Sequence, residues 1–114
     1  MARMNTGVGA ALLVAAACLA PAVLAGDAPE AARRAQLVSL VRQDCGSCHG
    51  MTLKGGLGPP LTRDALRDKP PGSLVATMLY GRPGTAMPPW RGFVSGVEAE
   101  WIVRQLQEGT LHER

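Results

Sequence analysis

The residues best suited to chemistry form one short run, Cys45-Gly46-Ser47-Cys48-His49. Two thiols and an imidazole at this spacing fit a redox dithiol, half of a zinc site, or covalent haem attachment. A thioredoxin-like dithiol follows a strand in a βαβ frame, whereas an amphipathic helical pattern precedes this run. A zinc site needs four ligands. After residue 25 the chain has no cysteine outside this run, and His112 is its one other histidine. The run therefore predicts haem attachment, in which both thiols add to the porphyrin vinyl groups and the imidazole binds iron.

The residue that binds iron opposite His49 decides whether such a protein carries electrons or binds ligands. Met51 is two residues from His49 and cannot reach the far face of the ring. Met78 belongs to an apolar helical pattern and is expected in the core, and His112 is expected in solvent. Met87 stands in a glycine- and proline-rich segment that cannot become helix. Met87 is therefore the predicted sixth ligand, and a loop methionine that only fills the haem pocket is the alternative.

Ligation by an imidazole and a thioether leaves iron low-spin and without an open position. The geometry is then nearly the same in both oxidation states, so little rearranges when one electron moves. The soft thioether also favours Fe(II) and raises the reduction potential. These ligands predict an electron carrier rather than an enzyme.

The first 25 residues are predicted to be an export signal rather than part of the fold. One charge, Arg3, precedes an apolar run from Val8 to Leu19, and small residues lead to a cleavage site after Ala25. The run is shorter than the roughly 20 residues that span a bilayer. An uncleaved N-terminal membrane anchor is the alternative interpretation. Cys18 is interpreted as an apolar residue of the signal rather than a lipid-modified cysteine. Because bacteria attach haem covalently outside the cytoplasm, we expect a periplasmic protein of a Gram-negative bacterium.

Residues 26–114 are long enough for only a single small domain. The full sequence of 114 residues has 12 basic and 9 acidic side chains, a composition that excludes disorder, collagen-like repeats and a protein of many membrane spans. No block of Lys or Arg is present, so nucleic acid is not an expected partner. A membrane is expected as a partner only if the signal stays uncleaved. A domain of this size folds with a thin margin, which a covalently bound cofactor improves.

The hydrophobic pattern predicts an all-α fold with helices over Ala28–Asp44, Thr62–Lys69, Gly72–Tyr80 and Ser95–Gln107. The first helix is expected to end at the Cys-x-x-Cys-His run. Gly55–Pro60 is predicted to be a loop, because its glycines and prolines sustain neither helix nor central strand. The residues expected to face the core are Leu37, Val38, Leu40 and Val41 in the first helix, and Val97, Trp101, Ile102, Gln105 and Leu106 in the last.

Local signals predict where these helices begin and end. Thr62 is the expected N-cap of the second helix, and the third begins at Pro71 or is capped by Ser73. Ser95-Gly96-Val97-Glu98 has the pattern of a capping box. Gly109 is expected to end the last helix.

Three motifs in order resemble class I c-type cytochromes: Cys45-Gly46-Ser47-Cys48-His49-Gly50, Gly58-Pro59-Pro60-Leu61 and Met87-Pro88. The resemblance covers residues 28–109. It implies a compact class I cytochrome c fold, with about four to five short helices around one covalently bound haem c. It also implies that the first and last helices cross, with Trp101 at the crossing.

The same resemblance assigns roles to individual residues. Cys45 and Cys48 form the thioethers, and His49 and Met87 are the axial ligands. The carbonyl group of Pro59 accepts a hydrogen bond from the ring nitrogen of His49, a contact that tunes the ligand. Pro59 as a turn residue alone is the other interpretation.

A narrower resemblance concerns the run from Cys45 to Pro59 and the run from Gly84 to Trp90. Both are similar to small periplasmic monohaem cytochromes c associated with the haem-cd nitrite reductases of denitrifying bacteria. This implies a protein that receives electrons from an upstream donor and passes them to the nitrite reductase, or a factor that assists haem d maturation. The short span between His49 and Met87 places the chain among the compact bacterial forms.

Two alternatives stay open at this point. A labile sixth ligand would make the protein a binder of a gas or a nitrogen oxide instead of a carrier. Basic residues expected around the haem edge either steer an acidic partner or are ordinary solvated charges. These residues are Lys54, Arg63, Arg67, Lys69, Arg82 and Arg91.

Overall fold

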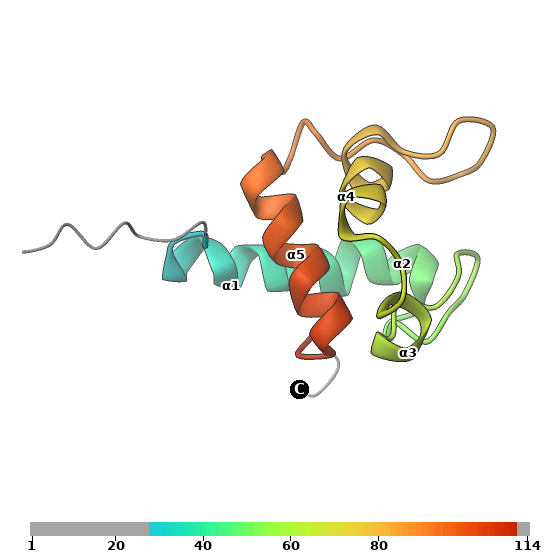
Figure 1. Cartoon of the computed structure of the whole chain (residues 1–114), viewed down its shortest axis with the longest axis horizontal. Coiled ribbons are helices and arrows are strands. Elements are labelled where there is room, and N and C mark those ends of the chain that lie inside the picture. Colours follow the sequence, from blue (N-terminus) through green and yellow to red (C-terminus); the bar gives the residue numbers. More distant parts are fainter. Residues whose placement is uncertain (1–27, 112–114) are drawn as a thin grey trace, which may run out of the picture.

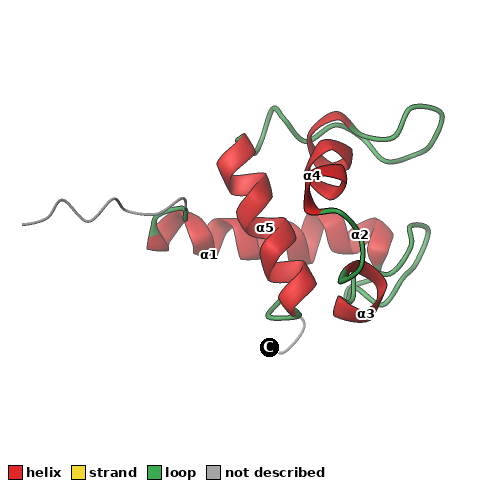
Figure 2. Cartoon of the chain, viewed as in Figure 1, coloured by secondary structure: helices red, strands yellow, loops and turns green. Residues whose placement is uncertain are grey.

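The computed structural model describes residues 28–111, which fold entirely into helices, turns and loops (Figures 1 and 2). This part of the chain contains no strand, so the all-α prediction is confirmed. The predicted export signal with Cys18, and the C-terminal His112, lie outside the described residues. None of the helices between residues 28 and 111 combines the length and apolar character that a membrane span requires.

The N-terminal helical run begins later and ends later than the sequence predicted. Helix α1 (Ala31–Leu40) passes without a break into a π-helical turn, η1 (Val41–Cys45), and then into α2 (Gly46–His49). The prediction of one helix over Ala28–Asp44 is therefore wrong at both ends, and the two cysteines and His49 lie inside the run. Gly50, with φ of 91°, ends it.

Local chemistry explains both differences. Pro29 disfavours helical torsion angles for the residue before it, and Glu30 still has an extended ψ of 153°. No proline follows until the glycine-rich loop, so nothing stops the helix at residue 44. Leu37 and Val41, four residues apart on one face, are both fully buried.

Helix α3 (Arg63–Leu66) is shorter than the sequence predicted. Thr62 is its N-cap as expected, and its hydroxyl oxygen accepts a hydrogen bond from the backbone N–H of Ala65 at 3.4 Å. The predicted end at Lys69 is wrong, because the residue before Pro70 is disfavoured in a helical conformation.

Helix α4 (Pro71–Tyr80) begins at Pro71, one of the two starts that the sequence allowed. Proline suits the first turn, since the N–H that it lacks has no partner there. Gly81, with φ of 71°, ends the helix. Met78 is buried in the core, as predicted.

Helix α5 (Gly96–Glu108) begins with the predicted capping box. Ser95 N–H donates to Glu98 Oε2 at 2.8 Å, and Glu98 N–H donates to Ser95 Oγ at 3.2 Å. Gly109 ends the helix in the left-handed conformation. The prediction for Val97 is wrong: its side chain is 47% exposed, whereas Ala99 in the same first turn is fully buried, so this turn meets the core on the side of Ala99. The buried residues of α5 are Ala99, Trp101, Ile102, Val103 and Leu106.

Helices α1 and α5 cross in Figure 1. Arg33 on α1 is joined to Glu98 on α5, with 2.6 Å between Nε and Oε1, and Leu37 and Ile102 are fully buried in one core cluster. Helices α3 and α4 both pack on α5. The loop that follows α2 and the loop that follows α4 project from the same end of the fold in Figure 1.

Candidate functional site

Cys45, Cys48 and His49 share the last two turns of the N-terminal helical run. Cys45 closes η1, whereas Cys48 and His49 lie in α2. Both thiols are free; Cys45 is half-buried and Cys48 is exposed. Burial raises the pKa of the Cys45 thiol to about 11, and the charge of Asp44 acts in the same direction. The two thiols thus stand about one helical turn apart in the sequence, in different surroundings.

A backbone oxygen fixes the direction of the His49 imidazole. Its Nδ1 lies 2.7 Å from the carbonyl oxygen of Pro59. Because a carbonyl oxygen only accepts, Nδ1 carries the proton and donates it in this bond. No described residue forms a hydrogen bond with the other ring nitrogen, Nε2. An imidazole in this tautomer presents the Nε2 lone pair to a metal ion.

The glycine-rich loop packs against the Cys-x-x-Cys-His run itself. The N–H groups of Gly55 and Gly58 donate to the carbonyl oxygens of His49 and Cys48, both at 2.8 Å, and so satisfy the last turn of the helix. A Cβ atom on Gly58 would lie 2.7 Å from both Nδ1 and Cε1 of His49. Gly58 therefore allows the backbone to lie directly against the ring.

Gly58 was predicted to lie in a loop and belongs to the Gly58-Pro59-Pro60-Leu61 motif, but its contact with the His49 ring was not predicted. Glycine permits an approach of backbone to a neighbouring group that any side chain prevents. A glycine directly before Pro59 permits such a contact, but the sequence does not indicate which group it approaches.

Met87 lies in a loop that the end of α4 holds at its base. The N–H of Arg82 donates to the carbonyl oxygen of Met87 at 3.2 Å, and the N–H of Trp90 donates to that of Met78 at 2.9 Å. The Met87 side chain is half-buried, and no described residue bonds to its sulfur. The loop therefore leaves a thioether that is available as a ligand.

The other three candidates for the sixth ligand lie elsewhere. Met78 on α4 is buried in the core, and Met51, two residues after His49, is 70% exposed. His112 lies outside the described residues. Met87 lies in a loop, as its prediction as the sixth ligand requires.

These residues fit a covalently bound haem. Two thiols on one helical run suit two thioether bonds, and the oriented imidazole beside them offers Nε2 as a ligand. A thioether on a separate loop supplies the second kind of donor found in electron-carrying haem proteins.

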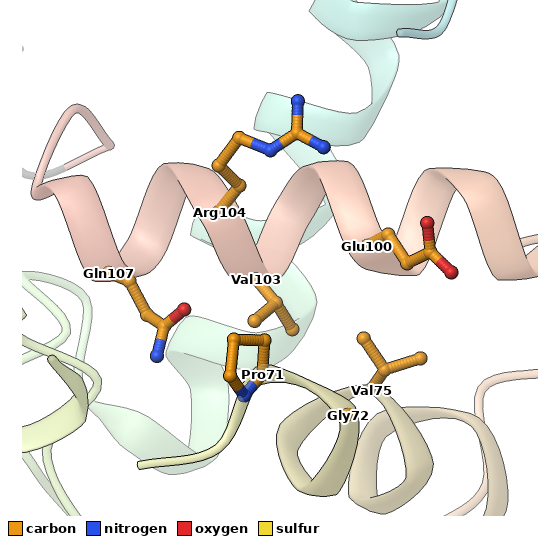
Figure 3. A pocket seen from close by; sticks show the side chains of 7 residues that line it. All are labelled: Pro71, Gly72, Val75, Glu100, Val103, Arg104 and Gln107. Atoms are coloured by element: carbon orange, nitrogen blue, oxygen red, sulfur yellow. The ribbon is translucent and has the colours of Figure 1, made fainter. Parts of the chain in front are cut away.

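A different hollow on the surface lies between α4 and α5 (Figure 3). Val103 on α5 points toward Pro71 at the start of α4. Gln107, at one end of this hollow, donates through Nε2 to the carbonyl oxygens of Leu66 and Lys69, at 2.9 Å each. These bonds tie α3 to α5, and none of the predicted haem-binding residues lines the hollow.

The helical fold and the oriented Cys-x-x-Cys-His run define a haem-binding protein of the c type, and comparison with known proteins agrees. Residues 32–104 match the family described as cytochrome C oxidase, cbb3-type, subunit III. The chain is 56% identical over 101 residues to cytochrome c55X of Pseudomonas aeruginosa, which covers 89% of this chain and 84% of that protein. The chain belongs to the c-type cytochrome family, whose cofactor is covalently bound haem c.

Two further similarities concern a solved structure and a larger protein. The structure of the c-type cytochrome NirC matches with a TM-score of 0.72 and 60% identity, over 73% of this chain and 98% of that chain. Dihydro-heme d1 dehydrogenase of Pseudomonas aeruginosa is 34% identical over 89 residues, which are 78% of this chain but only 17% of that protein. A cytochrome of this kind therefore also resembles a part of a much longer protein.

Proposed function

We propose that the protein is a periplasmic carrier of single electrons, with one haem c bonded to Cys45 and Cys48 and with His49 and Met87 as axial ligands. The observation that carries the proposal is the oriented imidazole, which is bonded through Nδ1 to the Pro59 carbonyl oxygen and has Nε2 unbonded. Haem iron supplies the one-electron chemistry between Fe(III) and Fe(II).

Each of these residues then has a distinct task. The two thioethers keep the cofactor from dissociating. The hydrogen bond to the Pro59 carbonyl raises the basicity of the His49 ring and fixes its orientation. Met87 would supply a thioether ligand to the iron, which would leave no open position for an external ligand and would favour Fe(II).

The redox partner that we propose is a haem-cd nitrite reductase of denitrification. The runs around Cys45 and Met87 resemble cytochromes associated with such reductases. The similarity to dihydro-heme d1 dehydrogenase also supports a link to haem d. The chain would pass electrons to the reductase after it receives them from an upstream donor.

The charge distribution supports docking to an acidic surface. Residues 51–94 carry six basic and two acidic side chains, whereas the remaining described residues carry four basic and five acidic ones. Arg67 alone among the six is paired, with Asp64 at 3.4 Å and Asp68 at 3.6 Å. The unpaired cations attract an acidic partner at long range, and salt weakens this attraction.

A second candidate function is assistance in haem d maturation. It is favoured by the 34% identity to a segment of dihydro-heme d1 dehydrogenase. A dehydrogenase removes electrons from its substrate, and a separate one-electron carrier is a chemically suitable acceptor. The same cytochrome would then be reduced during maturation instead of serving the reductase during turnover.

Substitution of Met87 tests the ligand set. We expect the exported wild type to show a low-spin c-type spectrum that carbon monoxide leaves unchanged, with the near-infrared band of a sulfur ligand to ferric iron. Met87→Ala should lose that band, bind carbon monoxide, and lower the midpoint potential by a sizeable part of the roughly 0.8 V that axial ligands span. Met51→Ala, at an exposed methionine, is the control and should match the wild type. An unchanged Met87→Ala protein would remove Met87 from the iron and favour a ligand-binding function.

The partner is tested in a deletion strain and with purified proteins. If the protein is the donor, deletion lowers nitrite reduction while the haem d content of the reductase stays normal, and the reduced cytochrome is rapidly oxidised by the reductase. The rate of this oxidation should fall as ionic strength rises. Loss of haem d itself on deletion would instead support the maturation role.

A further inference from the structure

The loop that carries Met87 is organised by one hydroxyl group. The Thr85 Oγ1 donates to the carbonyl oxygen of Arg82 at 2.7 Å and accepts from the N–H of Met87 at 3.3 Å. The backbone N–H of Thr85 also donates to the Arg82 carbonyl at 3.0 Å, and Arg82 N–H donates to the Met87 carbonyl at 3.2 Å. The loop is thus closed on both sides of Met87, and Thr85 makes the closure on its N-terminal side.

Little else holds this part of the loop. Every residue from Arg82 to Ala86 is exposed, so no burial of apolar surface fixes its conformation. Gly84 lies within it at φ of 78°, and a Cβ atom there would meet no other atom within 4 Å. No other described group bonds to the Met87 N–H. Without the Thr85 hydroxyl, this N–H would have only water as a partner.

We propose that Thr85 is a positioning residue that holds the Met87 thioether on the haem iron. This inference rests on the proposed function, in which Met87 is the sixth ligand. Thr85 touches neither the iron nor the sulfur; it acts through the backbone of Met87. When the backbone of Met87 is fixed, only the torsion angles of its flexible side chain still have to be ordered for the sulfur to reach the metal.

The same contact sets how readily an external ligand replaces Met87. A looser backbone lowers the fraction of time that the thioether is bound, and this fraction governs the apparent affinity of any competing ligand. Loss of the hydroxyl should therefore show as tighter binding of an added ligand and as a weaker sulfur-to-iron band.

The test compares Thr85→Val with Thr85→Ser in the exported, haem-loaded protein. Valine keeps the branched shape and removes the hydroxyl, whereas serine keeps the hydroxyl and removes a methyl group. Thr77→Val is the matched control, because Thr77 Oγ1 donates to the Ser73 carbonyl at 2.9 Å within α4. Imidazole is titrated into the ferric protein, and the near-infrared band and the midpoint potential are recorded.

We expect Thr85→Val to bind imidazole about fivefold more tightly than the wild type, the effect of one lost hydrogen bond, with a weaker band and a lower potential. Thr85→Ser and Thr77→Val should both match the wild type. If Thr85→Val also matches it, or if serine does not restore wild-type binding, the positioning role is wrong. The melting temperature of each variant is also measured, and tighter imidazole binding by Thr85→Val at an unchanged melting temperature would place the effect in the Met87 loop.

The Met87→Ala experiment separates the two proposals. If Met87→Ala loses the band while Thr85→Val does not change, the ligand set stands and only the role of Thr85 fails. If Met87→Ala keeps the wild-type spectrum, the ligand set fails, and the inference about Thr85 fails with it.

Discussion

The loop that packs against His49 and the loop that carries Met87 hold the two proposed axial ligands in different ways. Around His49 the structure fixes the side chain itself: the ring is bonded to the Pro59 carbonyl at 2.7 Å, and the backbone of Gly58 lies against it. Around Met87 the structure fixes the backbone: its N–H is bonded to Thr85 and its carbonyl oxygen to Arg82. No described residue bonds to the sulfur.

This difference indicates which ligand gives way first. The orientation of the His49 imidazole is set before a metal binds, so little conformational freedom is lost on ligation. Methionine has three rotatable bonds in its side chain, and these lose their freedom when the sulfur binds. We therefore expect the His49 side to act as a fixed support and Met87 to be the ligand that is replaced first.

The largest effect is expected where the fixed support is broken. In Gly58→Ala the new Cβ atom would lie 2.7 Å from two atoms of the His49 ring, so the ring or the loop has to move. Crowding of this kind costs about 1–3 kcal/mol of folding stability and also weakens the hydrogen bond to Pro59. We expect a several-fold lower yield of haem-loaded protein, measured as haem per polypeptide, and a lower melting temperature.

Gly72→Ala is the control for this substitution. A Cβ atom on Gly72 would meet nothing within 4 Å, and alanine is favoured over glycine in a helix such as α4 by up to about 1 kcal/mol. Its haem content should equal that of the wild type. If Gly58→Ala also loads haem normally and melts like Gly72→Ala, the imidazole is not fixed by this contact, and the contrast between the two loops fails.

The second effect concerns the base of the Met87 loop and compares two glycines with positive φ. Alanine costs about 1–3 kcal/mol at such positions of positive φ, and the cost is higher at Gly81, whose ψ of −171° places it in a region that is essentially restricted to glycine. At Gly84 nothing lies within 4 Å of the new Cβ atom, whereas at Gly81 it would lie 2.6 Å from the Met87 carbonyl oxygen. Gly81→Ala should therefore weaken the near-infrared band and admit carbon monoxide, in addition to losing stability.

Gly84→Ala should lose stability with a smaller spectroscopic change, because its Cβ atom would meet no other atom within 4 Å and would strain only the exposed turn between Arg82 and Thr85. Thermal unfolding and carbon monoxide binding, measured on both variants, separate the two contributions. Equal carbon monoxide binding by Gly81→Ala and Gly84→Ala would mean that the base of the loop does not position Met87.

Most of the helical fold follows from local patterns in the sequence. The capping box at Ser95, the N-cap at Thr62 and the left-handed Gly109 act over a few residues, so the sequence alone predicts them. The continuation of the first helix through Cys48 was not predicted, because a π-helical turn has no clear signature in residue types. The exposure of Val97 depends on where α5 meets its neighbours, which periodicity alone does not define.

The candidate site divides in the same way. The Cys-x-x-Cys-His run carries its chemistry in residue type and spacing, so Cys45, Cys48 and His49 could be named from the sequence. The contact of Gly58 with the His49 ring brings together residues nine positions apart in the chain, and a glycine does not indicate what it packs against. The hydroxyl of Thr85 had a weaker local signal, since threonine often bonds to nearby backbone in loops.

The smallest effect is expected outside both loops, where Arg33 on α1 meets Glu98 on α5. Hydrogen bonds from Arg33 and from the Ser95 N–H hold the pKa of Glu98 below its usual range. A carboxyl group whose pKa is lower in the folded protein than the value of about 4.3 in the unfolded chain stabilises the fold above that pH. This contribution is lost as the pH falls through the folded pKa.

Glu98→Gln removes the charge but keeps an oxygen that can accept from the Ser95 N–H. We expect its melting temperature to lie at most a few degrees below that of the wild type at pH 7, because the Arg33 side chain is 37% exposed and such pairs contribute little. The melting temperatures of Glu98→Gln and of the wild type should become equal as the pH is lowered below about 4. Glu100→Gln, on the same helix, is the control and should melt like the wild type.

The spectroscopy of Glu98→Gln sharpens the contrast between the loops. Neither Arg33 nor Glu98 is bonded to residues 50–59 or 81–90, so the near-infrared band and the midpoint potential should equal those of the wild type. A weaker band at pH 7, where the folded state still predominates, would mean that the crossing of α1 and α5 also positions Met87. The thioether would then depend on the helical scaffold as well as on its own loop, and the division into a fixed and an exchangeable side would have to be redrawn.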